Sequence, residues 1–139
     1  MALIVRLYEE ADHDAVLRLW EGAGIERPWL DLGAEIDAMI RHDPSLFFVA
    51  VDGNDVVGAV MGGYDGRRGW MYHLAVEASI RRGGIGRQLV LALEEAMRNR
   101  GVAKINLQVR SGNEEVISFY ERVGYVDEEL TSMGKRLST

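Results

Sequence analysis

The sequence contains no cysteine, and this absence excludes a disulfide framework and any reaction that needs a thiolate nucleophile. No apolar run approaches the roughly 18 to 20 residues that cross a membrane. Basic residues are in deficit: 16 Lys and Arg against 22 Asp and Glu give a formal charge of −6, which disfavours nucleic-acid binding as the main activity. The three histidines, at positions 13, 42 and 73, lack the spacing of metal ligands, so we expect no metal.

What is present fits one folded domain. A length of 139 residues suits a single hydrophobic core, and 47% hydrophobic with 27% charged residues is typical of a globular chain. The amino-terminal stretch MALIVRLYEEAD has acidic residues where a signal peptide would have its apolar region. We therefore expect a single domain over residues 1–139, cytoplasmic and without membrane association.

The apolar period changes several times along the chain between the values of strands and helices. Strands are predicted at 3–8, as a meander over 46–76, and at 104–109, and helices after Asp12, at 33–41, at 84–100 and at 113–123. Ser111 and Glu114 have the spacing of a capping box before the last helix. The tail from Glu129 to Leu137 alternates weakly, which predicts an edge strand. The whole pattern indicates an α/β or α+β fold with one mixed sheet.

The stretch RRGGIG, residues 81–86, directly precedes the helix predicted at 84–100. The first N–H groups of a helix lack partners and carry partial positive charge, so they attract anions. The glycines would let a phosphate approach this backbone, and Arg81, Arg82 and Arg87 supply positive charge around it. The stretch therefore predicts a phosphate or pyrophosphate site; the alternative is a plain turn with solvated arginines.

Two common phosphate-binding loops do not fit these residues. A Walker loop ends in Gly-Lys followed by Ser or Thr, whereas Gly86 is followed by Arg87 and Gln88. A dinucleotide fingerprint would need a third glycine where the chain has Leu89. Neither a P-loop nor a dinucleotide site is therefore expected.

With the apolar LAV before it, the segment from Arg81 to Gly86 resembles the coenzyme A pyrophosphate loop of the GNAT acetyltransferase superfamily. The next helix, the strand KINLQV and the segment NEEVISFYERVGY follow in the order of that family's core, so the resemblance covers essentially the whole chain. The stretches ERPW, MGGYDGRRGW and INLQVR are further similar to the bacterial YpeA-type branch and to ribosomal-protein alanine acetyltransferases. The resemblance implies a single mixed, mostly antiparallel sheet with splayed central strands and helices on both faces.

The resemblance also implies a cofactor site for acetyl-CoA, the acetyl donor. The residues that would bind it are the main chain of Leu74, Ala75 and Val76, and the loop residues Arg81, Arg82, Gly83, Gly84, Ile85, Gly86 and Arg87. Asn113 matches a position whose amide contacts the cofactor, although it is equally a candidate for an ordinary helix N-cap.

Tyr120 matches the tyrosine that faces the cofactor sulfur and protonates the leaving thiolate; the alternative is a core residue on a helical stripe. A base must also deprotonate the acceptor amine. Relatives carry a glutamate where this chain has Gln108, and an amide does not accept a proton at neutral pH. Glu77 is the first candidate base, with a solvated carboxylate as its alternative, and Tyr72, His73 and Asp31 follow.

The acceptor implied by the resemblance is a primary amine, either a small molecule or a peptide N-terminus. Candidate substrate-binding residues are Trp29, Asp31, Tyr64 and Gln108. A homodimer is common among similar proteins and is a possible assembly. Two other functions fit the same loop: a non-catalytic acyl-CoA-binding or sensor domain, and a phosphate-binding interaction module unrelated to CoA.

Overall fold

The computed structural model describes residues 3–25, 27 and 29–138, with the side chains of Arg81 and Arg82 excepted. Two compact units are formed, by residues 1–107 and by residues 108–139. The expectation of one domain over residues 1–139 stays a prediction. In the described part of the chain, none of the helices combines the length and the apolar character that crossing a bilayer requires.

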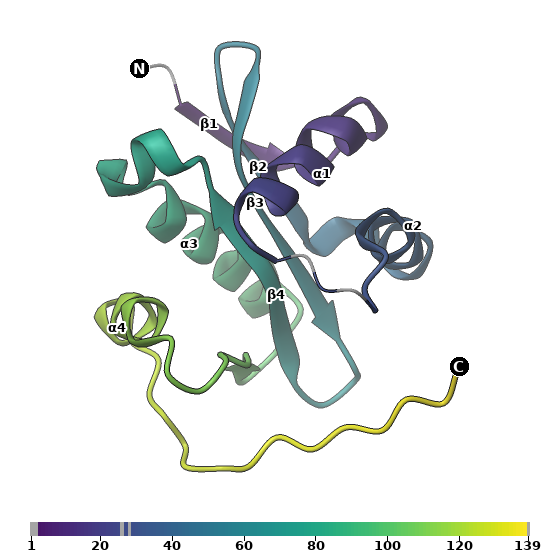
Figure 1. The fold of residues 1–139 in the computed structure, drawn as a ribbon, viewed down its shortest axis with the longest axis vertical. Helices are drawn as coiled ribbons and strands as arrows, with labels where there is room; N and C mark the ends of the chain where they lie inside the picture. Colours follow the sequence, from purple (N-terminus) through teal and green to yellow (C-terminus); the bar gives the residue numbers. More distant parts are fainter. Residues whose placement is uncertain (1–2, 26, 28, 139) are drawn as a thin grey trace. The chain divides into compact units, whose positions relative to one another are not determined.

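The larger unit is built on a five-stranded sheet (Figure 1). Its strands follow one another across the sheet in chain order: β1 (Leu3–Leu7), β2 (Phe47–Asp52), β3 (Asp55–Tyr64), β4 (Gly69–Val76) and β5 (Ile105–Asn106). Neighbouring strands are antiparallel from β1 to β4, and β5 is parallel to β4. The predicted mixed, mostly antiparallel sheet is confirmed, and so is the meander in the centre of the chain.

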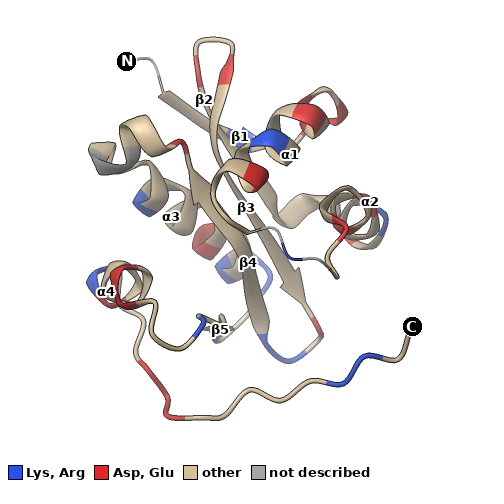
Figure 2. Cartoon of the chain, in the orientation of Figure 1, with Lys and Arg blue, Asp and Glu red and all other residues tan. Residues whose placement is uncertain are grey.

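Helices cover both faces of this sheet, as predicted. Helices α1 (His13–Gly22) and α2 (Leu32–His42) share one apolar cluster with β2, β3 and β4, in which Trp20 and Ile36 are fully buried. Helix α3 (Ile85–Asn99) buries an apolar stripe that includes Leu89 and Leu93 and contacts β2, β3 and β4. Charged residues gather on the helices and turns and leave the middle of the sheet apolar (Figure 2).

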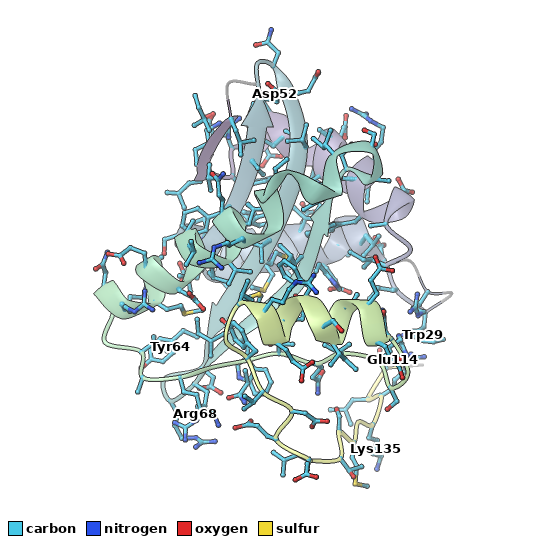
Figure 3. All side chains as sticks on the ribbon, turned by 90° about the vertical axis from the view of Figure 1, so that its left-hand side faces the viewer. Trp29, Asp52, Tyr64, Arg68, Glu114 and Lys135 are labelled. Atoms are coloured by element: carbon cyan, nitrogen blue, oxygen red, sulfur yellow. The ribbon has the colours of Figure 1, made fainter. Side chains whose placement is uncertain are left out.

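Tight turns at the two ends of the sheet hold the meander in register. Asp52 lies at the β2–β3 end, and Tyr64 and Arg68 lie at the opposite, β3–β4 end (Figure 3). In the β3–β4 turn one oxygen of Asp65 accepts the backbone N–H groups of Arg67 and Arg68, at 2.8 and 2.7 Å. An aspartate side chain that accepts backbone N–H groups two and three residues ahead stabilises a tight turn. This turn reverses the chain direction between β3 and β4.

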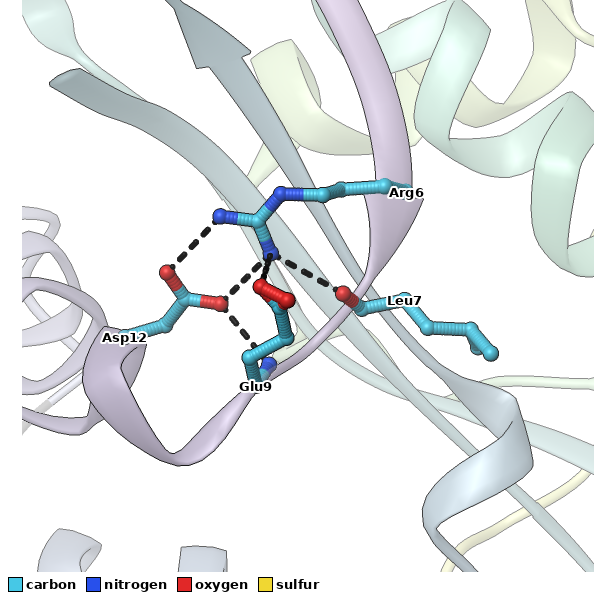
Figure 4. A network of polar contacts seen from close by, with 4 residues as sticks. All are labelled: Arg6, Leu7, Glu9 and Asp12. Carbon is cyan, nitrogen blue, oxygen red and sulfur yellow. Dashed lines mark hydrogen bonds and ion pairs between the residues drawn. The ribbon is translucent and has the colours of Figure 1, made fainter. Parts of the chain in front are cut away.

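An ion pair between the partly exposed Arg6 and the buried Asp12 joins β1 to the start of α1 (Figure 4). The guanidinium of Arg6 reaches both oxygens of Asp12, at 2.8 and 3.0 Å, and Asp12 also accepts the backbone N–H of Glu9 at 2.8 Å. Burial works to raise the pKa of Asp12, but the hydrogen bonds from Arg6 and Glu9 outweigh it and lower the pKa below its ordinary value. The carboxylate is therefore the stabilised form in the folded chain.

The smaller unit contains one helix, α4 (Glu114–Arg122). Its N-cap is Asn113, whose side-chain oxygen accepts the N–H of Val116 at 3.4 Å. The capping box predicted for Ser111 is therefore wrong, because the helix begins too late for Glu114 to be its third residue.

Two strand predictions also need correction. The strand predicted at 104–109 is reduced to Ile105–Asn106, since pairing with β4 stops at Trp70. No strand forms over 129–137. Glu129 has a φ of 56°, outside the extended region, and its N–H bonds Asp127 Oδ1 at 2.8 Å, so the chain turns where the alternation predicted a strand.

We expect Asp12→Asn to lower the free energy of unfolding at pH 7 by an amount on the order of 2 kcal/mol, because Arg6 loses the charge it pairs with. A carboxyl group whose folded pKa is lowered contributes stability above its unfolded pKa of ~3.9, and this contribution is lost as the pH falls through the folded pKa. Urea unfolding at pH 7 and below pH 3 measures both effects, and the gap between wild type and variant should narrow in acid.

The control is Asp14→Asn, since the Asp14 side chain is 85% exposed. A loss of stability for Asp14→Asn equal to that for Asp12→Asn would contradict the importance of the Arg6–Asp12 pair.

Candidate functional site

A bulge interrupts β4 in the middle of the sheet. Ala59 is opposite Ala75 and Met61 is opposite Tyr72, so one residue of β3 faces two residues of β4, His73 and Leu74. His73 has a φ of 53°, in the left-handed region that residues other than glycine seldom adopt. The bulge therefore breaks the alternation of the strand at this point.

The side chain of His73 is held by helices on the α1–α2 face. Its Nε2 lies 2.8 Å from Oε1 of Glu35 in α2, and its ring meets Trp20 of α1 edge-on at 5.0 Å and 63°. The two polar side chains are partly buried, with 20% of His73 and 33% of Glu35 exposed. A histidine and a carboxylate are thus joined at the bulge.

Beyond the bulge, one side of β4 has no neighbouring strand among the described residues. β5 pairs with β4 only at Gly69 and Trp70, so β4 and β5 separate beyond these residues, as predicted for the splayed strands. On the other side, Ala75 pairs with Ala59 and the N–H of Glu77 donates to the carbonyl of Val57 at 2.8 Å. The ladder to β3 therefore runs through Glu77 and Ala75 as far as the bulge, where His73 and Leu74 lie.

The glycine-rich stretch forms the start of α3. A 3-10 segment, η3 (Ala78–Gly83), leads to Gly84, which has a φ of 78° and is the N-cap of α3 without a side-chain hydrogen bond. The N–H of Gln88 donates to the carbonyl of Gly84 at 3.1 Å. The N–H groups of Ile85, Gly86 and Arg87 precede this bond and have no partner within the helix. A helix start of this kind attracts anions, and the phosphate site predicted here stays a prediction.

Gly58 of β3 brings this helix start close to the open half of β4. A Cβ placed on Gly58 would lie 3.1 Å from Cγ2 of Ile85 and 3.3 Å from the carbonyl oxygen of Ala75. The first residue of α3 and a main-chain group of β4 therefore meet over the same glycine. A ligand with a phosphate at one end and a chain able to follow a strand would find both features side by side.

The model of the acetyltransferase (GNAT) family matches residues 4–125. An acetyltransferase of Pectobacterium atrosepticum is 42% identical over 133 residues, which cover 96% of this chain and 94% of that protein. The chain belongs to the GNAT family. It is therefore an N-acetyltransferase that takes its acetyl group from acetyl-CoA.

Two solved structures have the same fold. AAC(6')-Iy in complex with the bisubstrate analogue CoA-S-monomethyl-acetylneamine gives a TM-score of 0.82 at 14% identity and covers 99% of this chain and 100% of its own. The ribosomal-protein alanine N-acetyltransferase of Escherichia coli gives a TM-score of 0.76 at 23% identity and covers 88% and 77%. At these identities the likeness shows the GNAT fold alone.

The predicted GNAT cofactor residues fall into two groups. Leu74, Ala75 and Val76 lie on β4, and residues 83–87 form the start of α3, so the larger unit holds both. The side chains of Arg81 and Arg82 lie outside the described residues. Asn113 and Tyr120 belong to the smaller unit, in which the Tyr120 ring contacts Phe119 and Tyr125. Burial raises the pKa of Tyr120 to about 12, so its hydroxyl remains protonated at neutral pH.

The candidate acceptor residues are not gathered in one cluster. Trp29, 55% exposed, lies far from Tyr64 (Figure 3), and the Tyr64 hydroxyl donates to the carbonyl of Gly66 at 3.0 Å. Asp31 is the N-cap of α2 and accepts the N–H of Ala34 at 3.0 Å. Gln108 is exposed in the smaller unit and donates to Ser132 at 2.5 Å. Their roles in binding stay predictions.

The sequence did not predict the pairing of Glu35 with His73. Glu35 is 38 residues from His73 in the chain, and no local spacing connects the two. Glu77, the first candidate base, is exposed at the N-cap of η3, where its carboxylate accepts the hydroxyl of Ser79 at 3.5 Å. Among the described residues, no group of three or more His, Asp or Glu side chains is arranged to hold a metal ion.

Gly58→Ala should lower the free energy of unfolding by about 1–3 kcal/mol, because a methyl group placed 2.8 Å from Leu89 Cδ1 overpacks the contact between α3 and the sheet. The matched control is Gly22→Ala at the end of α1, where a Cβ meets nothing within 4 Å and the change should be neutral or slightly stabilising. Urea unfolding of both variants measures the difference. Equal stabilities for the two would show that α3 does not depend on this close approach.

Proposed function

We propose that this acetyltransferase transfers its acetyl group to a primary amine, on a small molecule or a peptide N-terminus, by direct attack of the amine on the thioester. No covalent enzyme intermediate is involved. The observation that carries the proposal is the uncapped, glycine-led start of α3 beside the open, bulged half of β4. One feature suits a pyrophosphate, and the other suits an extended arm that pairs with a strand.

Acetyl-CoA would bind along these two features. The N–H groups of residues 83–87 hold the pyrophosphate, with the positive charge of Arg81, Arg82 and Arg87 around it. The main-chain groups of Leu74 pair with the pantetheine arm. The N–H of Leu74 polarises the thioester carbonyl, a role that Ala75 suits less because it pairs with Ala59.

Tyr120 would act as the general acid. The electron pair of the breaking C–S bond stays on sulfur, which takes the proton of the phenol and leaves as a thiol. A phenol that remains protonated well above neutral pH, as the raised pKa of Tyr120 indicates, always has this proton to give. Asn113 would contact the cofactor through its side-chain N–H groups, since its oxygen caps α4.

The GNAT fold by itself does not determine which class of amine accepts the acetyl group. One fold neighbour is a ribosomal-protein alanine N-acetyltransferase, and another is in complex with a CoA–acetylneamine bisubstrate analogue, so the GNAT fold serves both peptide and small-molecule amines. Trp29, Asp31, Tyr64 and Gln108 are the side chains we propose to contact the acceptor. The second candidate function is an acyl-CoA-binding sensor without turnover, which the same helix start would serve.

The first measurement is thermal stabilisation by acetyl-CoA, coenzyme A, ATP and NAD in parallel. A ligand at ~100 times its dissociation constant adds about 2.7 kcal/mol to a folded state that alone binds it. We expect shifts with the two CoA species and none of similar size with ATP or NAD. The absence of a shift with either CoA species would remove the proposed site.

Tyr120→Phe should lower kcat by about 100-fold or more, because the leaving sulfur loses its proton donor, while the acetyl-CoA shift is retained. Turnover is followed by release of free thiol with an amine that the wild type accepts. Tyr125→Phe, which removes a hydroxyl from a neighbouring ring, is the control and should keep full activity. Full activity in Tyr120→Phe would exclude the general-acid role, and CoA binding without turnover of any amine would support the sensor.

A further inference from the structure

The hydrogen bond between His73 and Glu35 decides which nitrogen of the imidazole can accept a proton. An ionised carboxylate only accepts hydrogen bonds, so the Nε2 atom that faces Glu35 at 2.8 Å is the one that carries hydrogen. In a neutral ring the other nitrogen, Nδ1, then has a lone pair. Glu35 thus favours the tautomer in which the basic atom is Nδ1, the ring nitrogen that does not face Glu35.

The bulge places this imidazole next to the main-chain groups that we propose to hold the thioester. His73 directly precedes Leu74, whose N–H we propose to polarise the thioester carbonyl, and the His73 side chain is held on the α1–α2 face. The left-handed φ of His73 is unfavourable relative to that of an extended residue. A strained backbone that two helices hold in place, Trp20 from α1 and Glu35 from α2, is typical of positions with a functional constraint.

We infer that Nδ1 of His73 accepts the proton of the acceptor amine and that Glu35 is the positioning residue that orients the ring. The inference rests on the proposed function and deepens it, because it supplies the base that Gln108 does not provide. Of the other ionisable side chains near β4, Tyr72 precedes His73 on the strand and Glu77 follows the end of the strand, at the exposed start of η3.

His73 and Tyr120 together account for every proton that is transferred in the reaction. The ammonium of the acceptor gives one proton to Nδ1, and the lone pair that remains on nitrogen forms the new C–N bond with the thioester carbon. As the C–S bond breaks, its electron pair leaves with sulfur, which takes the proton of Tyr120. The second proton of the amine replaces the one that Tyr120 gave. The products are the amide and the thiol, and the imidazolium, stabilised by Glu35, returns its proton to water.

The test compares four variants with the wild type: His73→Asn, Glu35→Gln, their double variant, and Glu77→Gln. Asparagine is chosen at 73 because it tolerates the left-handed backbone. The probe is acetyl-CoA with the amine that the wild type turns over fastest, taken from a panel of short peptides with free N-termini, aminoglycosides and polyamines. Every variant is first checked for unchanged thermal stabilisation by acetyl-CoA.

We expect His73→Asn to lower kcat by about 100-fold or more and Glu35→Gln by about tenfold. The double variant should be no slower than His73→Asn alone, since Glu35 acts through the ring. A fluorinated analogue of the amine, less basic and so already neutral in larger part, should lose less rate in His73→Asn than the parent amine does. A purely structural role for His73 would lower both rates equally.

A second histidine–carboxylate pair provides the matched control. Nε2 of His13 in α1 lies 3.6 Å from Oδ1 of Asp37 in α2, so it joins the same two helices at a distance from the bulge. His13→Gln and Asp37→Asn should leave kcat within about twofold of the wild type, because exposed pairs of this kind contribute little.

Full kcat in His73→Asn overturns the inference, and a loss confined to Glu77→Gln would assign the base to Glu77. Should His73→Asn fail to fold, unchanged kcat in Glu35→Gln overturns the inference by itself. If the wild type binds acetyl-CoA but turns over no amine of the panel, the proposed function fails first and the inference with it. That outcome is distinct from turnover that survives the loss of His73.

Discussion

One extra residue in β4 sets the directions of the groups on which the proposed chemistry depends. In an uninterrupted ladder, side chains alternate between the faces of the sheet and main-chain groups alternate between its neighbours. Between the pairs Ala59–Ala75 and Met61–Tyr72 this alternation is broken. His73 is held on the face of α1 and α2, and it directly precedes Leu74, whose main chain we propose to bind the thioester. The proposed base, His73, and the proposed thioester-binding residue, Leu74, are therefore neighbours on β4.

Such a conformation persists only where its surroundings favour it over a regular strand. A left-handed histidine is unfavourable in isolation, and the bulge leaves part of the ladder unpaired. The contacts that offset this cost come from side chains distant in the chain: Trp20 at the edge of the imidazole and Glu35 at its Nε2. On the opposite face, α3 packs on Gly58 closely enough that a methyl group would not fit. The sheet that contains the bulge therefore lies between two layers of helices.

The features that could be predicted from the sequence are those with a local cause. The β2–β3–β4 meander follows from short turns and apolar alternation, and the start of α3 follows from glycines before an apolar helical stripe. The bulge could not be predicted, because the sequence WMYHLAV alternates no differently from a regular strand. The pairing of His73 with Glu35 spans 38 residues and depends on how α2 packs. The error at 129–137 has the opposite origin: Asp127 and Glu129 turn the chain locally, and the weak alternation did not reveal it.

Gly84 also affects how the stability of the protein depends on its ligand. A serine or aspartate at this N-cap would satisfy the first N–H groups of α3 from within the chain, whereas glycine leaves them to an external partner. A pyrophosphate that completes the helix also adds its binding energy to the folded state. If acetyl-CoA is that partner, resistance to unfolding and to proteolysis rises and falls with the cellular supply of activated acetyl groups.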